Sequence, residues 1–122
     1  MPKVERDEKR ESRIENEAIV DAYGGEEKAL GWYYYLDGKI RFPFKARCIE
    51  ERSISPLKLG EFVKVVGMAD EYDCMKEMFV QIEWKNREFG IPLSQLEGVQ
   101  VDDETEEAIE DWQYWLNRGY MF

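Results

Sequence analysis

The stretch that decides the fold is residues 59–101, LGEFVKVVGMADEYDCMKEMFVQIEWKNREFGIPLSQLEGVQV. Residues 61–67 and 77–84 are rich in β-branched and aromatic residues, as strands are. In the second run the apolar residues alternate and share one face: Met78, Val80, Ile82 and Trp84. The turn KNRE follows, and residues 88–92 continue as a return strand. The stretch therefore predicts antiparallel strands joined by a tight hairpin.

Working outward, further short strands are expected on both sides. Residues 42–49 alternate in the same way, with one apolar face made of Phe42, Phe44, Ala46 and Cys48. Residues 92–96, PLSQL, predict a single 3₁₀ turn, and residues 98–101 predict a last short strand. Five short strands with a 3₁₀ turn between the fourth and the fifth predict a small SH3-like β-barrel.

Helices are expected before the strands. Apolar residues recur at helical spacing from Ile14 to Ala22, and Gly24-Gly25 ends this first helix. A second short helix carries Ala29, Trp32 and Leu36, and Asp37-Gly38 ends it. Residues 1–13 are almost all charged and have no apolar period, so we expect a flexible, frayed lead-in there.

A further helix is expected at the C-terminus. Asp103 is the predicted N-cap and Glu106 its capping-box partner. The apolar stripe that would dock this helix is Ile109, Trp112, Trp115 and Leu116. The chain of 122 residues is thus predicted to be one α+β domain over residues 14–122. It has two N-terminal helices, a five-stranded SH3-like barrel and a C-terminal helix.

Composition limits the function. Lys plus Arg total 17 and Asp plus Glu total 27, so the net charge is −10. An acidic chain repels phosphate groups, which argues against nucleic acid and anionic membrane surfaces and favours cations or a basic protein as partners. The same charge would also fit a role in solubility alone. No apolar run approaches the length of a membrane span, and the N-terminus is unlike a signal peptide, so we expect a cytoplasmic protein.

The chain contains no histidine. It therefore lacks the commonest general base and the commonest zinc ligand, and we expect no enzyme activity. Cys48 and Cys74 are too few for a disulfide scaffold or a zinc cluster. We expect them to be small buried thiols, although the sequence leaves open whether they pair.

Clusters of carboxylates are the feature of the sequence that points to a function. Asp70, Glu71 and Asp73 lie within four residues in the loop between the predicted second and third strands. Residues 97–111 hold eight acidic residues and no basic one. Calcium takes oxygen ligands from carboxylates, backbone carbonyls and water in a flexible geometry. No EF-hand loop is present, so a calcium site must be assembled from separate segments. A solvated polar loop and a helix start that complements the helix dipole are the structural alternatives.

Several segments together resemble a known family. They are Gly31–Asp37, Phe42–Ala46, Ser55–Leu57 with Gly60, Val65–Glu71, Ile91–Leu96 and Ala108–Trp115. In these segments the chain is similar to the bacterial and cyanobacterial calcium-binding family typified by CcbP. The resemblance implies a small acidic cytoplasmic protein that binds calcium and helps to set its free level. It also implies that Asp37, directly after the aromatic helix, is a ligand.

We therefore expect Ca²⁺ to bind reversibly through surface carboxylates, with the chain acting as a buffer or a sensor of cytoplasmic calcium. The expected metal ligands are Asp37 from the resemblance and Asp70, Glu71 and Asp73 from their chemistry. The alternative is a metal-independent SH3-like module whose aromatic surface binds a basic peptide or protein.

Overall fold

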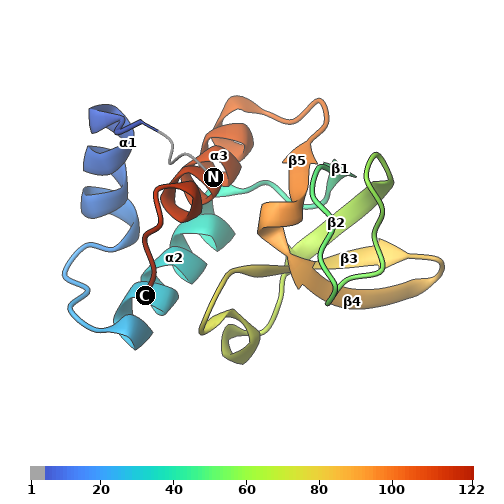
Figure 1. Cartoon of the computed structure of the whole chain (residues 1–122), viewed down its shortest axis with the longest axis horizontal. Helices are drawn as coiled ribbons and strands as arrows, with labels where there is room; N and C mark the ends of the chain where they lie inside the picture. Colours follow the sequence, from blue (N-terminus) through green and yellow to red (C-terminus); the bar gives the residue numbers. More distant parts are fainter. Residues whose placement is uncertain (1–4) are drawn as a thin grey trace.

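The structure is a computed structural model and describes residues 5–122. Its helical elements are α1 (Glu8–Arg13), the π-helical turn η1 (Ile14–Ala18), α2 (Gly25–Lys39), the 3₁₀ turns η2 (Glu71–Cys74) and η3 (Leu93–Gln95), and α3 (Asp103–Asn117). Its strands are β1 (Phe44–Cys48), β2 (Phe62–Met68), β3 (Phe79–Trp84), β4 (Arg87–Pro92) and β5 (Leu96–Gly98). Figure 1 shows the α-helices together on one side and the sheet on the other. The fold is α+β, as the sequence predicts.

The five strands form one antiparallel sheet in the order β4-β3-β2-β1-β5. Within residues 5–122 no backbone ladder joins β4 to β5, so the sheet is open. The expectation of a closed SH3-like barrel is therefore not confirmed. The sheet stays open because β5 is short. It spans only Leu96–Gly98, and its backbone hydrogen bonds are made to β1. It follows β4 through the expected 3₁₀ turn, η3.

The alternation of residues along the strands is confirmed where it was clearest. Phe44, Ala46 and Cys48 of β1 are buried, and so are Val80 and Ile82 of β3. Each of these strands presents its apolar face to the core.

The predicted last strand at residues 98–101 is wrong. The strand ends at Gly98, and Gln100 adopts a left-handed backbone with φ of 54°. An alanine Cβ at Gly98 would meet the Val101 side chain at 2.8 Å, so the chain turns tightly here and leaves the sheet.

The N-terminal helices differ from the prediction. The first begins at Glu8, inside the expected lead-in, and ends at Ala18 instead of reaching Ala22. The second starts at Gly25 and runs through Asp37-Gly38 to Lys39. The prediction of a frayed segment is therefore wrong for Glu8–Arg13, while residues 1–4 lie outside the described residues.

A buried carboxylate explains why the charged segment is helical. Asp111 of α3 is fully buried. Arg10 donates a hydrogen bond to its Oδ1 at 2.7 Å, Arg13 donates to both of its oxygens at 2.7 and 2.8 Å, and the Tyr35 hydroxyl donates to Oδ2 at 2.7 Å. These bonds fasten α1 onto α3. The N-cap of α1 is Asp7, whose side chain accepts a hydrogen bond from the backbone of Arg10.

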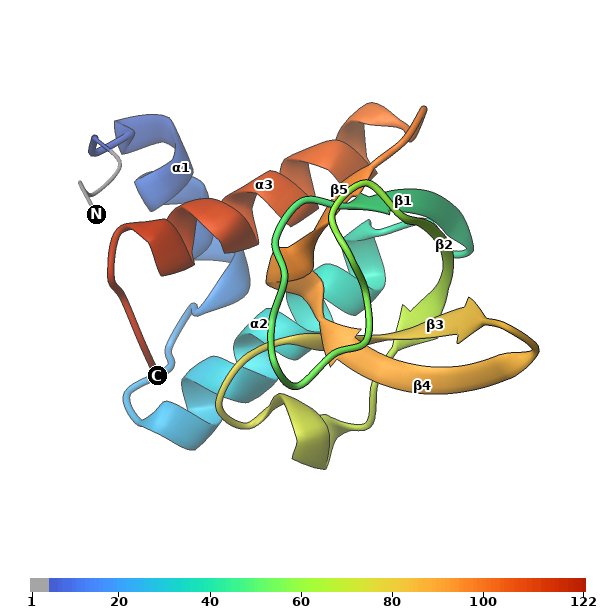
Figure 2. The same ribbon diagram turned by 45° about the vertical axis from the view of Figure 1, so that its right-hand side comes forward.

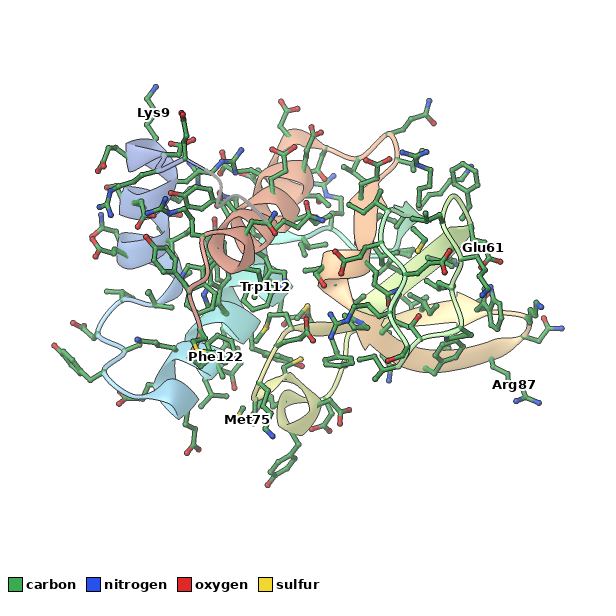
Figure 3. All side chains as sticks on the ribbon, in the orientation of Figure 1. Lys9, Glu61, Met75, Arg87, Trp112 and Phe122 are labelled. Atoms are coloured by element: carbon green, nitrogen blue, oxygen red, sulfur yellow. The ribbon has the colours of Figure 1, made fainter. Side chains whose placement is uncertain are left out.

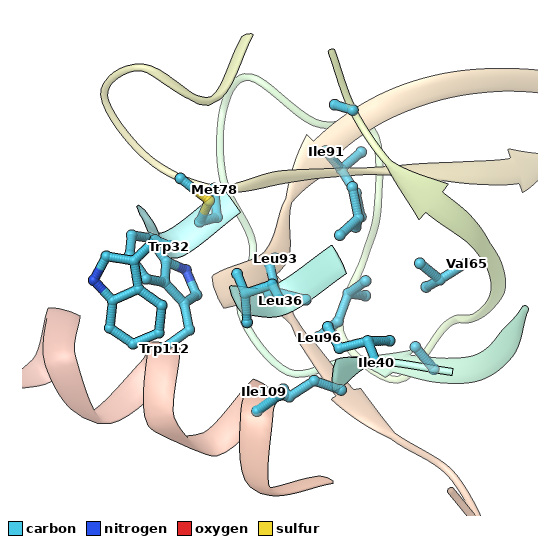
Figure 4. Close-up of a cluster of buried hydrophobic side chains, with 14 of the residues drawn as sticks. Trp32, Leu36, Ile40, Val65, Met78, Ile91, Leu93, Leu96, Ile109 and Trp112 are labelled. Atoms are coloured by element: carbon cyan, nitrogen blue, oxygen red, sulfur yellow. The ribbon is translucent and has the colours of Figure 1, made fainter. Parts of the chain in front are cut away.

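The core lies between the helices and the sheet (Figure 4). Trp32 of α2 and Trp112 of α3 meet edge to face, with ring centroids 5.1 Å apart. Leu36 and Ile109 extend this contact toward the sheet. Burying each such side chain contributes about 2 kcal/mol to folding. The sheet supplies fully buried apolar side chains at Val65, Ile91 and Leu96, and η3 adds Leu93.

The start of α3 also differs by one residue, because Asp102 rather than Asp103 is the N-cap, and its side chain makes no capping bond. The cysteine prediction is confirmed, since Cys48 and Cys74 are free and buried. Within the described chain, no helix has the length and apolar character needed to cross a membrane.

Candidate metal site

The end of α2 packs beside η2, and this contact brings predicted site residues from two segments together. The Tyr34 hydroxyl of α2 donates a hydrogen bond to Glu71 Oε1 at 2.7 Å. Asp70 caps η2 by accepting a hydrogen bond from the backbone of Tyr72 at 3.0 Å. The turn therefore presents its acidic start to the helix that carries Asp37. Figure 2 shows the short turn of η2 beneath the sheet, near α2.

The pKa of the Tyr33 phenol is raised, in part by negative charge in this region. Burial raises the pKa of Tyr33, and the carboxylates of Asp37, Glu71 and Asp70 raise it further, as does the Cys74 thiol. Three of the four predicted ligands therefore act on one side chain, although Asp37 is more than thirty residues from the other two. Asp37, Asp70 and Glu71 each lie within electrostatic reach of Tyr33.

Asp73 and Asp70 both influence the neighbouring thiol of Cys74. Burial raises the pKa of Cys74 to about 11, with Asp73 and Asp70 adding to the shift. The thiol stays protonated at neutral pH, so Cys74 is unsuited to ligate a metal as a thiolate.

The predicted carboxylate ligands are exposed and do not form a closed cage. Asp37, Asp70, Glu71 and Asp73 are all exposed to solvent. Among the residues that the structure describes, no three Asp, Glu or Cys side chains converge closely enough to hold a metal ion. The available donors are carboxylate oxygens, which suit a hard cation such as calcium rather than zinc. The donor chemistry fits calcium, and binding would require the side chains or the loop to close around the ion.

The local setting of Asp37 differs from the prediction. The sequence placed it after the helix, next to a flexible glycine. In the structure it lies in the last turn of α2, and Gly38 is helical as well. The carbonyls of a last helical turn carry partial negative charge, which still favours a nearby cation.

The acidic run at the start of α3 is partly neutralised. Glu107 forms ion pairs with Arg13 at 3.4 Å and with Lys39. Glu110 pairs with Arg10 at 3.0 Å. These partners come from α1 and α2, so a cation would have to compete with bound arginine and lysine.

A small hollow beside this run was not predicted. Its volume is about 120 Å³, and its lining includes Glu97, Glu106 and Glu110. The spacing of Glu106 and Glu110, four residues apart on one helix face, was the available signal. Arg47 pairs with Glu97 and Arg10 with Glu110, so only Glu106 lacks an ion-pair partner among the described residues. The hollow is therefore a weaker cation site than the region around Tyr33.

The CcbP family, described as calcium binding, matches residues 12–116. The chain belongs to this calcium-binding family. The crystal structure of Anabaena CcbP is 46% identical, superposes with a TM-score of 0.89 and covers 100% of both chains. A calcium-binding protein in its calcium-binding form is also 46% identical, with a TM-score of 0.86 over 100% of both chains. A comparison with curated proteins found no match.

Membership of the CcbP family agrees with the resemblance seen in the sequence. It supports calcium as the ion, and the family is one of calcium binding rather than of enzymes.

Proposed function

We propose that this chain binds Ca²⁺ reversibly through surface carboxylates at the junction of α2 and η2. The carrying observation is the contact between α2 and η2, where the hydroxyl of Tyr34, one helical turn before Asp37, donates a hydrogen bond to Glu71 Oε1 at 2.7 Å. Carboxylates from two segments with backbone carbonyls nearby are the ligand set that calcium takes in flexible sites. Family membership independently supports calcium as the ion.

The proposed role is to buffer or sense cytoplasmic calcium. The ligands are exposed and are not assembled into a cage, so the ion has a short path to water. Such a site would exchange its ion readily. Calcium would also be favoured over magnesium, because magnesium demands a near-ideal octahedron and gives up its waters reluctantly. Binding, and not catalysis, is the proposed activity.

A calcium titration by isothermal calorimetry tests the site. Asp37→Asn keeps the shape of the side chain and removes one charge, so we expect calcium to bind at least tenfold more weakly, a loss of about 1.4 kcal/mol. Glu71→Gln should weaken binding by a similar factor. Asp73→Asn tests the fourth predicted ligand. We expect it to weaken calcium binding less than Asp37→Asn does, because Asp73 lies toward Cys74.

Asp21→Asn is the matched control. Asp21 precedes α2, at the end of the helix opposite Asp37, and asparagine tolerates its left-handed backbone (φ of 56°) as aspartate does. Every titration is run at one ionic strength, because diffuse attraction is screened within about 10 Å at 0.1 M salt. If Asp37→Asn and Asp21→Asn weaken binding equally, the ion senses only the overall charge and the proposed site is wrong. If the wild-type protein binds no calcium, the proposed function is wrong and the alternative of a metal-independent binding module is favoured.

A further inference from the structure

The sheet carries an apolar groove on this acidic protein. Its volume is about 550 Å³, and it crosses β1, β2 and β3 where Phe44, Phe62 and Trp84 contribute to its lining. Phe62 leaves 56% of its surface exposed. An aromatic side chain this exposed, beside a second ring in one hollow, is typical of surfaces that bind partners. None of the proposed calcium ligands lines the groove.

The charges of the groove are opposite in sign to those of the molecule. Lys45, Lys64 and Lys85 line it, against a single acidic residue, Glu83. Lys45 and Lys64 are direct cross-strand partners, an arrangement in which like charges destabilise a sheet, whereas on the other side Lys64 is paired across the strands with Glu83. Among the ion pairs of residues 5–122, none involves any of these three lysines. The chain as a whole has a net charge of −10.

The lysines and rings are interleaved. The Lys45 ammonium lies 4.6 Å from the centroid of the Phe62 ring, and that of Lys85 lies 4.5 Å from the Trp84 ring. Each contact holds a cation beside an apolar surface. A second hollow of about 320 Å³ shares Pro43, Phe44 and Lys45 with the groove and adds one basic residue, Arg41, and one acidic residue, Asp102. The apolar surface is therefore elongated, while its excess of basic residues lies in the first groove.

We propose that this groove binds an extended acidic segment of another protein, anchored by an aromatic or aliphatic side chain. Carboxylates of the segment would pair with Lys45, Lys64 and Lys85, and its apolar anchor would cover Phe62 and Trp84. The lysines of the groove favour a partner of negative charge, and the elongated shape of the groove suits an extended chain. The sequence-based alternative, a basic peptide on an aromatic surface, does not suit a groove that is rimmed by lysines.

Two other occupants fit less well. A nucleic acid is a long polyanion and would meet the net charge of −10 along its whole length, whereas a short peptide carries only a few carboxylates. A second copy of this chain would bring two bodies of net charge −10 together.

Selection of short random peptides displayed on phage, carried out in EDTA, tests the proposal. We expect the enriched peptides to be acidic and to contain an aromatic or aliphatic residue. A fluorescein-labelled copy of the most enriched peptide is then titrated by fluorescence anisotropy. Lys64→Glu and Phe62→Ser should each weaken its binding at least tenfold, and Lys45→Glu serves as the second charge reversal if either variant fails to fold.

Lys9→Glu is the matched control, because it makes the same charge change on exposed α1, at the far side of the molecule from Arg87 at the β3–β4 turn (Figure 3). It should change the affinity less than twofold, and Asp37→Asn should leave peptide binding intact. Three results would overturn the proposal: enrichment of basic peptides, no enrichment over the Phe62→Ser variant, or equal losses in Lys9→Glu and Lys64→Glu. Binding of oligo(dT), or wild-type self-association that Lys64→Glu abolishes, would assign the groove to another occupant.

Discussion

Asp111 is the buried carboxylate that ties the N-terminal segment to α3. Burial raises the pKa of its carboxyl, but hydrogen bonds from Arg13, Tyr35 and Arg10 outweigh burial and leave the pKa below its ordinary value. The folded state therefore favours the charged form. As the pH falls, the unfolded chain takes up this proton first, so the contribution to stability is complete above the ordinary aspartate pKa of about 3.9. It is lost as the pH falls through the lower folded-state value.

We expect Asp111→Asn to lower the free energy of unfolding at pH 7 by about 3 kcal/mol, because it leaves Arg10 and Arg13 without their buried partner. The difference from wild type should shrink as the pH falls through the folded-state pKa of Asp111. Urea unfolding over a series of pH values measures it. Asp103→Asn, exposed in the first turn of the same helix, is the control. A difference that stays constant with pH would show that the charge of Asp111 is not the cause.

At the scale of elements, the contact between α2 and η1 depends on Gly31. An alanine Cβ at this position would overlap the carbonyl oxygen of Ala18, at a separation that real Cβ atoms essentially never show. Gly38, in the last turn of the same helix, has nothing within 4 Å of the equivalent point. The two glycines are alike in helix propensity, and only the packing distinguishes them.

Gly31→Ala should therefore destabilise the protein by about 1–3 kcal/mol, because the backbone of η1 must move away. Gly38→Ala should stabilise it by up to about 1 kcal/mol, the usual gain from replacing a helical glycine. Thermal unfolding followed by circular dichroism compares the two. Equal melting temperatures would mean that α2 does not pack closely on η1.

For the whole molecule, the net negative charge links the stability of the fold to the binding of calcium. A net charge of −10 repels itself in the compact state, and a cation that binds only the folded chain relieves part of this repulsion. Calcium at a hundredfold excess over its Kd should stabilise the fold by about 2.7 kcal/mol. We expect calcium to raise the melting temperature more than magnesium does, and more than sodium at equal ionic strength. Identical shifts with the three salts would show screening without a site.

The local elements follow from patterns in the amino-acid sequence. The alternation in residues 42–49 and 77–84, the 3₁₀ turn at PLSQL and the apolar stripe of the last helix all appear in the structure. These patterns depend on neighbours within a few residues, so the sequence displays them directly. The acidic composition and the family segments likewise indicate calcium, because both are properties of the residues themselves and need no tertiary contact.

Other features depend on contacts between segments that are distant in the chain. The burial of Asp111, and with it helix α1, depends on partners about a hundred residues apart in the chain. The same holds for the open sheet, because whether β4 meets β5 depends on how the strands pair in space. The segments that carry Asp37, Asp70 and Glu71 meet only because α2 packs beside η2. Contacts between distant segments leave no periodic signal in the sequence, because each side chain's local pattern is the same whether or not its partner is present.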